Sequence, residues 1–261
     1  THTLITYHNV RSLAEEIMKN KSIPIDQVIP TFEKFLATEY KKKKWPYNNI
    51  IIDEGQDLSD NLLGQLQVFA EERNGTFYIF YDRNQYIFGQ GRSSWIEDHS
   101  DCRLVLYKNC RNTEEIARYI ASIMKIKSSY YENNIHGLPP EISYYQTPTE
   151  LKEIAEKFVK DMLKQKLRIE DIVILSVHSV PHSNLNGIKE LAGVPLSNVQ
   201  ESGKIFFTSV RKFKGLEAKA ILLIDIDDAK TSETLIQRLI YVGASRASAY
   251  LHLAFCKALK K

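Results

Sequence analysis

The stretch NNIIIDEGQDLSD, residues 48–60, predicts both the fold of this chain and part of its chemistry. Three consecutive isoleucines without polar alternation are typical of a strand buried on both faces of a parallel sheet. The strand runs directly into Asp53 and Glu54, and functional groups of open α/β sheets lie at the carboxyl ends of strands. The stretch therefore predicts an α/β fold with an acidic site, unless the acidic turn only caps the following helix.

Apolar runs of strand length alternate with longer amphipathic segments along the chain. The predicted strands are residues 3–7, 49–53, 76–82, 103–107, 141–145, 171–176, 204–210, 220–226 and 250–255. The predicted helices are residues 10–19, 29–40, 59–72, 113–124, 148–165 and 232–247, the third of them capped by Ser59. This alternation predicts two α/β domains with parallel sheets, residues 1–107 and 108–261, with the boundary near Tyr107–Arg111.

The composition is that of a globular protein with a full core, since 43% of the residues are hydrophobic and 26% are charged. The formal net charge of +3 permits a polyanionic partner but does not require one. The densest basic cluster, Lys41–Lys44, is interpreted as a solvated loop. Composition alone therefore identifies no partner.

The cysteines and the apolar runs indicate the cellular setting. The three cysteines form no C-x-x-C pair, which argues against a zinc site or a disulfide framework and favours a reducing, cytoplasmic setting. No apolar run approaches the roughly 18 residues needed to span a membrane, so no membrane partner is expected.

Later stretches place further polar residues beside predicted strands. Asp82 ends a second apolar run, and Gln85 follows three residues later. Arg111 begins the second half of the chain, and Arg246 lies at the end of the last predicted helix. The turn KGLE, residues 214–217, joins two buried strands. Because an exposed arginine is most often only a surface residue, none of these stretches decides the function alone.

In their order and spacing, these stretches resemble the motifs of superfamily 1 helicases of the UvrD/Rep type. IIIDEGQD resembles the Walker B motif D-E-x-Q-D, NCRNTEEI the N-Y-R-S motif, and LITYHNVRSLAEEI the DNA-contacting motif after the P-loop helix. YDRNQYIF resembles G-D-x-x-Q, with Tyr81 in place of glycine. FTSVRKFKGLEAKAILLID resembles T-x-H-x-x-K-G-L-E, with Arg211 where histidine is frequent. YVGASRA resembles Y-V-A-x-T-R-A, with Ser245 in place of threonine.

The resemblance implies two RecA-like parallel-sheet domains in an ATP-dependent DNA helicase or translocase, with movement 3′→5′ on single-stranded or tailed duplex DNA. The implied cofactors are ATP and Mg²⁺. Asp53 would hold Mg²⁺, Glu54 would act as general base, and Gln85 would sense the γ-phosphate. Arg111 and Arg246 would act as arginine fingers, because fixed guanidinium groups stabilise the charge of phosphoryl transfer.

Further contacts are implied by the same resemblance. The nucleotide would be contacted by Gln56, Gly215 and Glu217, with Glu217 at the ribose. Nucleic acid would cross both domains on residues suited to base stacking and phosphate contact, which are Thr6, His8, Asn9, Tyr86, Phe88, Thr208, Arg211 and Lys212. For the two aromatic residues, packing in a core is the alternative interpretation.

The chain contains no phosphate-binding loop of the form G-x-x-x-x-G-K-[ST]. In the helicase family this loop precedes the motif found here at LITY, so we expect it upstream of Thr1 and expect the first domain to be incomplete at its N-terminus. A non-catalytic nucleic-acid- or protein-binding module with the same fold is the alternative. A nuclease built on Asp53, Glu54 and Asp57 is less well supported, because no lysine is evident near them.

The spacing of the motifs limits the size of any insertion. Between Arg111 and Thr208 there is room for one α/β half, but not for the large second accessory domain of UvrD and Rep. This compact form resembles helicase modules of bacteria that are fused to nuclease-related domains. A fused or associated nuclease is therefore an expected partner.

Overall fold

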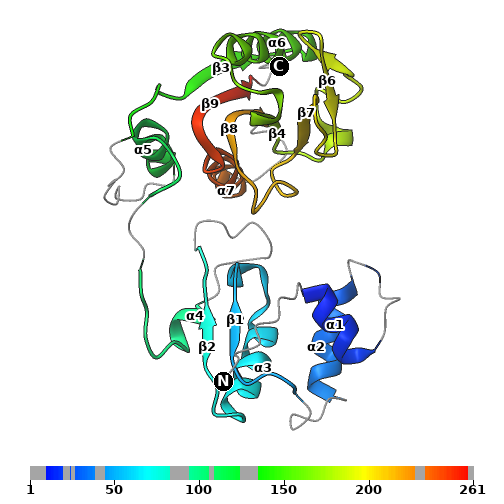
Figure 1. Ribbon diagram of the computed structural model, residues 1–261, viewed down its shortest axis with the longest axis vertical. Coiled ribbons are helices and arrows are strands. Elements are labelled where there is room, and N and C mark those ends of the chain that lie inside the picture. Colours follow the sequence, from blue (N-terminus) through cyan, green and yellow to red (C-terminus); the bar gives the residue numbers. More distant parts are fainter. Residues whose placement is uncertain are drawn as a thin grey trace. The chain divides into compact units, whose positions relative to one another are not determined.

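The computed structural model describes residues 10–19, 24, 27–38, 45–82, 94–105, 109–123, 135–226 and 233–257. These residues form two compact units, the first ending at Arg103 and the second beginning at Leu104 (Figure 1). The domain boundary near Tyr107–Arg111 stays a prediction, because residues 106–108 lie outside the described ranges. Within those ranges, no helix combines the length and the apolar character that a membrane crossing requires.

The first unit packs helices against a small parallel sheet. Its helices are α1 (Val10–Met18), α2 (Val28–Thr38), α3 (Asp60–Glu71) and the short α4 (Trp95–Asp98). Strand β1 (Ile50–Ile52) pairs in parallel with β2 (Phe77–Ile79), and a 3-10 turn, η3 (Gly55–Asp57), follows β1. Ser59 caps α3 as predicted, because its Oγ accepts a hydrogen bond of 3.1 Å from the Leu62 amide.

One face of this small sheet is exposed, which corrects the expectation that the strand at residues 49–53 is buried on both faces. Ile52 points toward the helices and is 8% exposed, whereas Ile51 is 67% exposed. Tyr78, the neighbour of Ile51 on β2, is also exposed. The apolar run predicted two covered faces, but the helices of the first unit that the structure describes bury only the Ile52 side.

The second unit is built on a seven-stranded sheet in the order β3-β9-β8-β4-β7-β6-β5. The strands are β3 (Glu141–Tyr145), β4 (Ile172–Ser176), β5 (Glu190–Leu191), β6 (Val194–Ser197), β7 (Ile205–Ser209), β8 (Ala218–Ile226) and β9 (Ala247–Cys256). All neighbouring pairs are parallel except β5 with β6. The predicted α/β class with parallel sheets is thereby confirmed.

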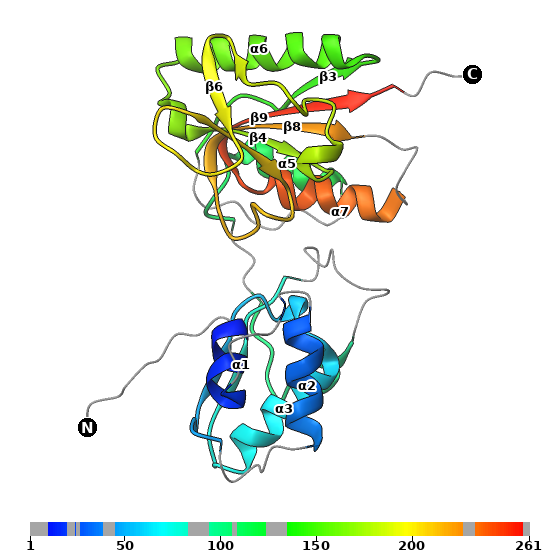
Figure 2. The same ribbon diagram turned by 90° about the vertical axis from the view of Figure 1, so that its right-hand side faces the viewer.

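Helices cover both faces of this sheet. Helix α6 (Pro148–Lys164) lies on one face, and α5 (Glu114–Ile123) and α7 (Glu233–Ala244) lie on the other (Figure 2). Along β8, Ile221 and Leu223 join the cluster under α5 and α7, whereas Leu222 joins the cluster under α6. The uninterrupted apolar runs of the sequence follow from this double cover, because both sets of alternating side chains are buried.

Strands β5 and β6 were not predicted from the sequence. The strand predicted at residues 103–107 is not formed by residues 103–105, the part of it that the structure describes. Strands β5 and β6 form a hairpin whose turn residues, Ala192 and Gly193, both have positive φ. Each strand is too short for a periodic signal, and Pro195 argued against a strand. Residues 103–105 form no strand, and the predicted strand at residues 3–7 lies outside the described ranges.

A buried carboxylate orders the loop that follows β4. Asp225 is fully buried, and its Oδ2 accepts hydrogen bonds of 2.6 Å from Ser176 Oγ and from Ser183 Oγ. Its Oδ1 accepts bonds from the backbone and side-chain amides of Asn184, at 3.1 and 2.9 Å. Burial raises the pKa of the neighbouring Tyr145 phenol, and the Asp225 charge adds to this effect. The network fixes the loop at the carboxyl edge of the sheet.

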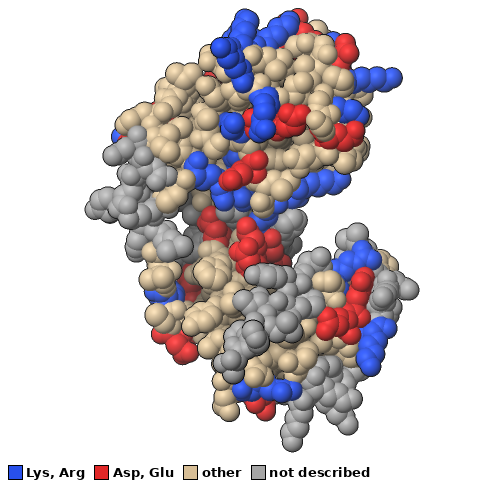
Figure 3. All heavy atoms as spheres, in the orientation of Figure 1, with Lys and Arg blue, Asp and Glu red and all other residues tan. Residues whose placement is uncertain are grey.

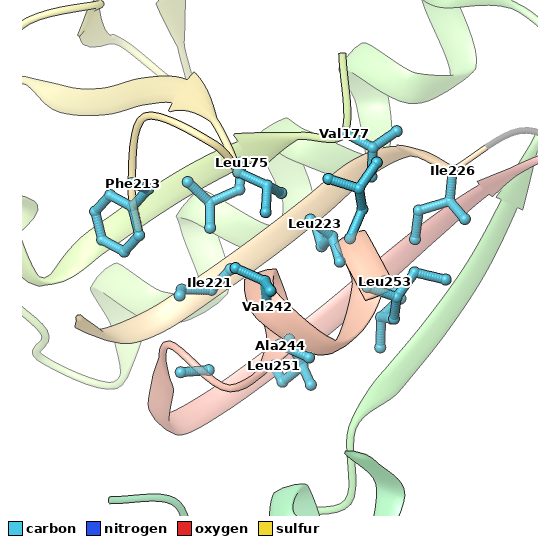
Figure 4. Close-up of a cluster of buried hydrophobic side chains, with 14 of the residues drawn as sticks. Leu175, Val177, Phe213, Ile221, Leu223, Ile226, Val242, Ala244, Leu251 and Leu253 are labelled. Carbon is cyan, nitrogen blue, oxygen red and sulfur yellow. The ribbon is translucent and has the colours of Figure 1, made fainter. Parts of the chain in front are cut away.

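Leu223 lies in the middle of the cluster drawn in Figure 4 and is fully buried. We expect Leu223→Ala to lower the free energy of unfolding by about 2–5 kcal/mol, because truncation leaves a cavity in a packed core. Equilibrium urea unfolding measures this change. The matched control is Leu216→Ala, whose side chain is 42% exposed and whose substitution we expect to cost less than about 0.5 kcal/mol. Equal losses in the two variants would contradict the assignment of β8 to the core.

Candidate functional site

The acidic turn lies at the carboxyl end of β1, as predicted. Asp53 is exposed and directly follows the strand, and its Oδ1 accepts a hydrogen bond of 2.9 Å from the Glu54 amide. Glu54 has φ 54° and ψ 42°, a left-handed conformation that is uncommon outside glycine. Such backbone strain is found more often at functional sites than elsewhere. The strained turn holds the Glu54 carboxylate next to the end of the strand.

The Gln56 side chain connects the turn after β1 to the chain after β2. Its side chain is 5% exposed, and its Nε2 donates a hydrogen bond to the Glu54 carboxylate. Its Oε1 accepts a bond of 3.1 Å from the backbone amide of Asp82, beyond β2. The two predicted acidic strand ends are therefore connected by one carboxamide. Within the described residues, Gln56 orients Glu54 rather than facing solvent.

Gly55 allows the turn to pass close to β2. Its amide donates a bond of 2.9 Å to the Phe80 carbonyl, and a Cβ at this position would lie 2.2 Å from Ile79 Cγ2. No side chain fits at that distance, so glycine is required by the close approach of the two segments. No local pattern in the sequence predicts this contact, because the packing partner lies on another strand.

The acidic turn suits a magnesium ion that arrives with a phosphate ligand. Mg²⁺ prefers oxygen ligands and is commonly bound through one or two carboxylates together with substrate phosphates. Asp53 provides one exposed carboxylate at the strand end. Among the described residues, no three His, Cys, Asp or Glu side chains are grouped so as to hold a metal ion by themselves. The residues thus fit an ion shared with a nucleotide better than a resident metal.

In the second unit, three predicted site residues lie at the amino ends of β8 and β9. Arg111 Nε donates a hydrogen bond of 2.8 Å to Glu217 Oε2, across 106 residues of sequence. Glu217 immediately precedes β8 and Arg246 immediately precedes β9. The first residues of these two strands, Ala218 and Ala247, are paired in register. The fold thus brings Arg111, Glu217 and Arg246 to one edge of the sheet.

Glu217 and Arg246 lie at the amino edge of their sheet, whereas the acidic turn of the first unit lies at the carboxyl edge of its own sheet. The carboxyl-end rule places Asp53 correctly, whereas Glu217 and Arg246 precede their strands. The ion pair of Arg111 and Glu217 is exposed, with side chains 43% and 61% accessible, so it orients the guanidinium but contributes only about 0–1 kcal/mol. Arg246 is 3% exposed. Its main chain accepts a bond of 3.0 Å from the Ala218 amide.

Gly215 forms the turn before Glu217. It has φ +85°, and a Cβ there would meet no atom within 4 Å. Glycine is therefore used here for its backbone conformation and not for space. The nucleotide contacts predicted for Gly215, Gln56 and Glu217 stay predictions.

The predicted nucleic-acid residues of the second unit lie at the opposite, carboxyl edge of the sheet, with Thr208 near the end of β7 and Arg211 and Lys212 just after it. Arg211 and Lys212 are exposed, whereas Thr208 is 1% exposed. On the face of the second unit seen in Figure 3, basic and acidic side chains are interspersed. Any contact with phosphates at this edge therefore depends on a few individual side chains.

Six of the predicted site residues lie outside the described ranges. They are Thr6, His8, Asn9, Gln85, Tyr86 and Phe88. Their proposed contacts with nucleic acid and with the γ-phosphate stay predictions.

Sequence reasoning missed two asparagines beside Arg111. Asn109 Oδ1 accepts bonds from the amides of Arg111 and Asn112, at 3.0 and 3.2 Å. Asn112 is 6% exposed, and its side chain donates hydrogen bonds to the backbone carbonyls on either side of Arg246. The only available signal was that NCRN carries two asparagines, and a turn or helix cap explains these equally well from sequence.

Glu217 and Arg246, but not Arg111 and its two asparagines, lie in a segment that matches a known family. Residues 204–254 match the UvrD-like helicase C-terminal domain. The resemblance predicted from the motifs is thereby confirmed for this helicase-like C-terminal segment, which includes Thr208, Glu217 and Arg246. No curated protein matches the chain.

The solved structures that match the chain include a domain of a possible DNA helicase and two viral helicases. A C-terminal domain of a possible DNA helicase from Lactobacillus plantarum WCFS1 is 15% identical, with a TM-score of 0.44, over 57% of this chain and 88% of that one. The PRRSV helicase is 12% identical, with a TM-score of 0.44, over 84% of this chain and 36% of that one. An arterivirus nonstructural protein 10 helicase, solved with DNA, is 12% identical, with a TM-score of 0.40, over 82% of this chain and 41% of that one. The chain thus spans well under half the length of both viral proteins.

The close approach at Gly55 can be tested by adding one methyl group. We expect Gly55→Ala to lower the free energy of unfolding by about 1–3 kcal/mol, because the new Cβ would overlap Ile79. The matched control is Gly64→Ala in α3, where the new Cβ would lie 3.5 Å from Trp95 in ordinary contact. This control should raise stability by up to about 1 kcal/mol, since alanine favours a helix. Changes of the same sign in both variants, measured by thermal unfolding, would contradict the packing at Gly55.

Proposed function

We propose that the protein is an ATP-dependent DNA helicase or translocase motor that moves 3′→5′ on single-stranded or tailed duplex DNA. The observation that carries this proposal is the gathering of Arg111, Glu217 and Arg246 at one edge of the second sheet. These residues come from three motifs far apart in sequence. Two arginines and an acid at one edge suit recognition of a nucleotide, whose phosphates are anionic and whose ribose carries hydroxyl groups.

The acidic turn of the first unit supplies the second part of the proposed chemistry. Asp53 would hold a Mg²⁺ ion that bridges phosphate oxygens and neutralises their charge. Glu54 would orient the attacking water and accept its proton. Gln56 supports this role, since its hydrogen bond fixes the Glu54 carboxylate.

The arginines would stabilise charge on the transferred phosphoryl group. Arg111 is exposed and is oriented by Glu217, so binding of a phosphate would replace one weak ion pair with another contact. Arg246 is buried in the structure, and its role requires that its guanidinium become accessible when the nucleotide binds. Gln85 would sense the γ-phosphate.

Nucleic acid would contact the carboxyl edge of the second sheet through Arg211 and Lys212. Cations at such positions bind phosphates without reading sequence. Thr208 is buried beside them, so we assign it to positioning of the end of β7. Contacts of Thr6, His8, Asn9, Tyr86 and Phe88 with the strand complete the proposed path. An attached nuclease is a further proposed partner.

The burial of Arg246 favours one rival function, a non-catalytic module that binds nucleic acid or protein through the same fold. A buried guanidinium cannot contact a phosphate, so such a module would retain the fold and lack hydrolysis. Hydrolysis of ATP by the wild-type protein separates the two functions.

We expect Glu54→Gln to abolish ATP hydrolysis by the full-length protein, with a fall in kcat of at least about 100-fold, because glutamine cannot accept the proton. Steady-state hydrolysis with and without single-stranded DNA measures the effect. The matched control, Glu72→Gln, changes an exposed glutamate at the far end of α3 and should retain the wild-type rate. Full activity in Glu54→Gln would remove Glu54 from the mechanism, and absence of hydrolysis in the wild type would favour the non-catalytic module.

We expect the double variant Arg211→Ala, Lys212→Ala to bind single-stranded DNA more weakly and to show a smaller salt dependence. Each lost phosphate contact should reduce the slope of log K against log[salt] by roughly 0.7. Fluorescence anisotropy between 50 and 200 mM salt, roughly the range over which such contacts weaken, measures both quantities. The control is Lys160→Ala, Lys164→Ala on α6, which removes the same charge from another face. An unchanged slope at the first pair would place the nucleic acid elsewhere.

A further inference from the structure

We infer that Asn112 is a positioning residue that sets the distance between Arg111 and Arg246. The inference rests on the proposed function, because it assigns both arginines to one nucleotide-dependent reaction. It goes beyond that function by naming a side chain that contacts no nucleotide. Its basis is a set of hydrogen bonds that join the two arginine segments through one carboxamide.

The carboxamide of Asn112 uses its full hydrogen-bonding capacity as a donor. Its Nδ2 donates to the carbonyl of Ser245 at 3.1 Å and to the carbonyl of Ala247 at 2.5 Å. These two carbonyls flank Arg246 on either side. The side chain therefore holds the backbone from which the Arg246 guanidinium extends, while its own backbone adjoins Arg111.

The other end of the carboxamide is fixed as well. Asn112 Oδ1 accepts a hydrogen bond of 2.9 Å from Asn109 Nδ2. Asn109 Oδ1 in turn accepts from the amides of Arg111 and Asn112. The turn that carries Arg111 is thus closed by Asn109 and attached to the Arg246 turn by Asn112.

A helix-capping role does not explain these bonds. A cap of α5 would accept a hydrogen bond from an amide in the first turn of the helix. The Glu114 amide instead donates to the Ile135 carbonyl at 3.0 Å, and the Thr113 amide donates to the Ser248 carbonyl at 3.2 Å. Asn112 therefore directs its side chain toward the start of β9 and away from the amides of α5.

The chemistry of the site requires an amide at this position. Two carbonyl oxygens face the same nitrogen, so the side chain must supply two hydrogens at once. Aspartate has the same shape but would place oxygen against oxygen, and alanine would leave both carbonyls without this donor. Because the contacts are buried, water cannot readily replace them.

The test uses Asn112→Ala and Asn112→Asp in the full-length protein, with hydrolysis of ATP measured at saturating single-stranded DNA. Misplacement of transition-state groups should lower kcat by about tenfold or more while KM changes less than about threefold. Asn109→Ala removes the three hydrogen bonds of the Asn109 side chain but leaves both bonds from Asn112 to the Arg246 turn, so it should give a smaller loss of kcat. Rates are expressed per folded molecule, from the native fraction at the assay temperature.

The matched control is Asn184→Ala, at the opposite edge of the same sheet. Its carboxamide also makes two hydrogen bonds, to Asp225 at 2.9 Å and to Tyr145 at 3.3 Å. We expect this variant to lose thermal stability as Asn112→Ala does, but to keep the wild-type kcat per folded molecule. Equal kcat losses in both variants would show that the effect of Asn112 is a general loss of stability and would overturn the inference.

The outcomes separate this inference from the proposed function. If the wild type hydrolyses ATP and Arg111→Ala does not, while Asn112→Ala and Asn112→Asp keep the wild-type kcat, the inference is wrong and the function stands. If the wild type hydrolyses no ATP, the proposed function fails and the inference fails with it.

Discussion

Strand β8 lies between β4 and β9 and is covered by helices on both faces, and the second unit depends on this double burial. Alternate side chains of β8 enter the two hydrophobic clusters. Burial of the side chains on one face of β8 therefore also fixes the register of the side chains on its other face. The register in turn aligns Ala218 with Ala247. The positions of Glu217 and Arg246 at one edge are therefore a consequence of how the core packs.

The first unit shows the same principle with one face only. Ile52 is buried against the helices, while Ile51 and Tyr78 on the other face are exposed. An apolar face that packs on nothing among the described residues contributes little to stability. The acidic turn is held instead by directional contacts, namely the Gln56 carboxamide and the hydrogen bond of Gly55 to Phe80.

The long elements could be predicted from the sequence, and the details of the site could not. Uninterrupted runs such as AILLIDI identify buried strands because both faces contribute apolar residues, and the cap at Ser59 has a local signal. The motifs also selected the arginines and the acids as candidate site residues, and their roles stay predictions. The burial of Arg246, the exposure of Ile51 and the bonds of Asn112 depend on partners distant in sequence. No periodicity or spacing encodes such partners, which explains why Asn112 went unnoticed beside Arg111.

The connection between β7 and β8 has a further consequence for how the chain can vary. Residues 210–217 run from the carboxyl edge of the sheet, next to Thr208, to the amino edge at Glu217. Surface loops generally tolerate added or lost residues. Here one inserted residue would displace the following chain by roughly 3.3 Å, more than the 2.8 Å that joins Arg111 to Glu217. The length of this connection is therefore under a constraint that its sequence, largely exposed apart from the buried Val210 and Phe213, does not reveal.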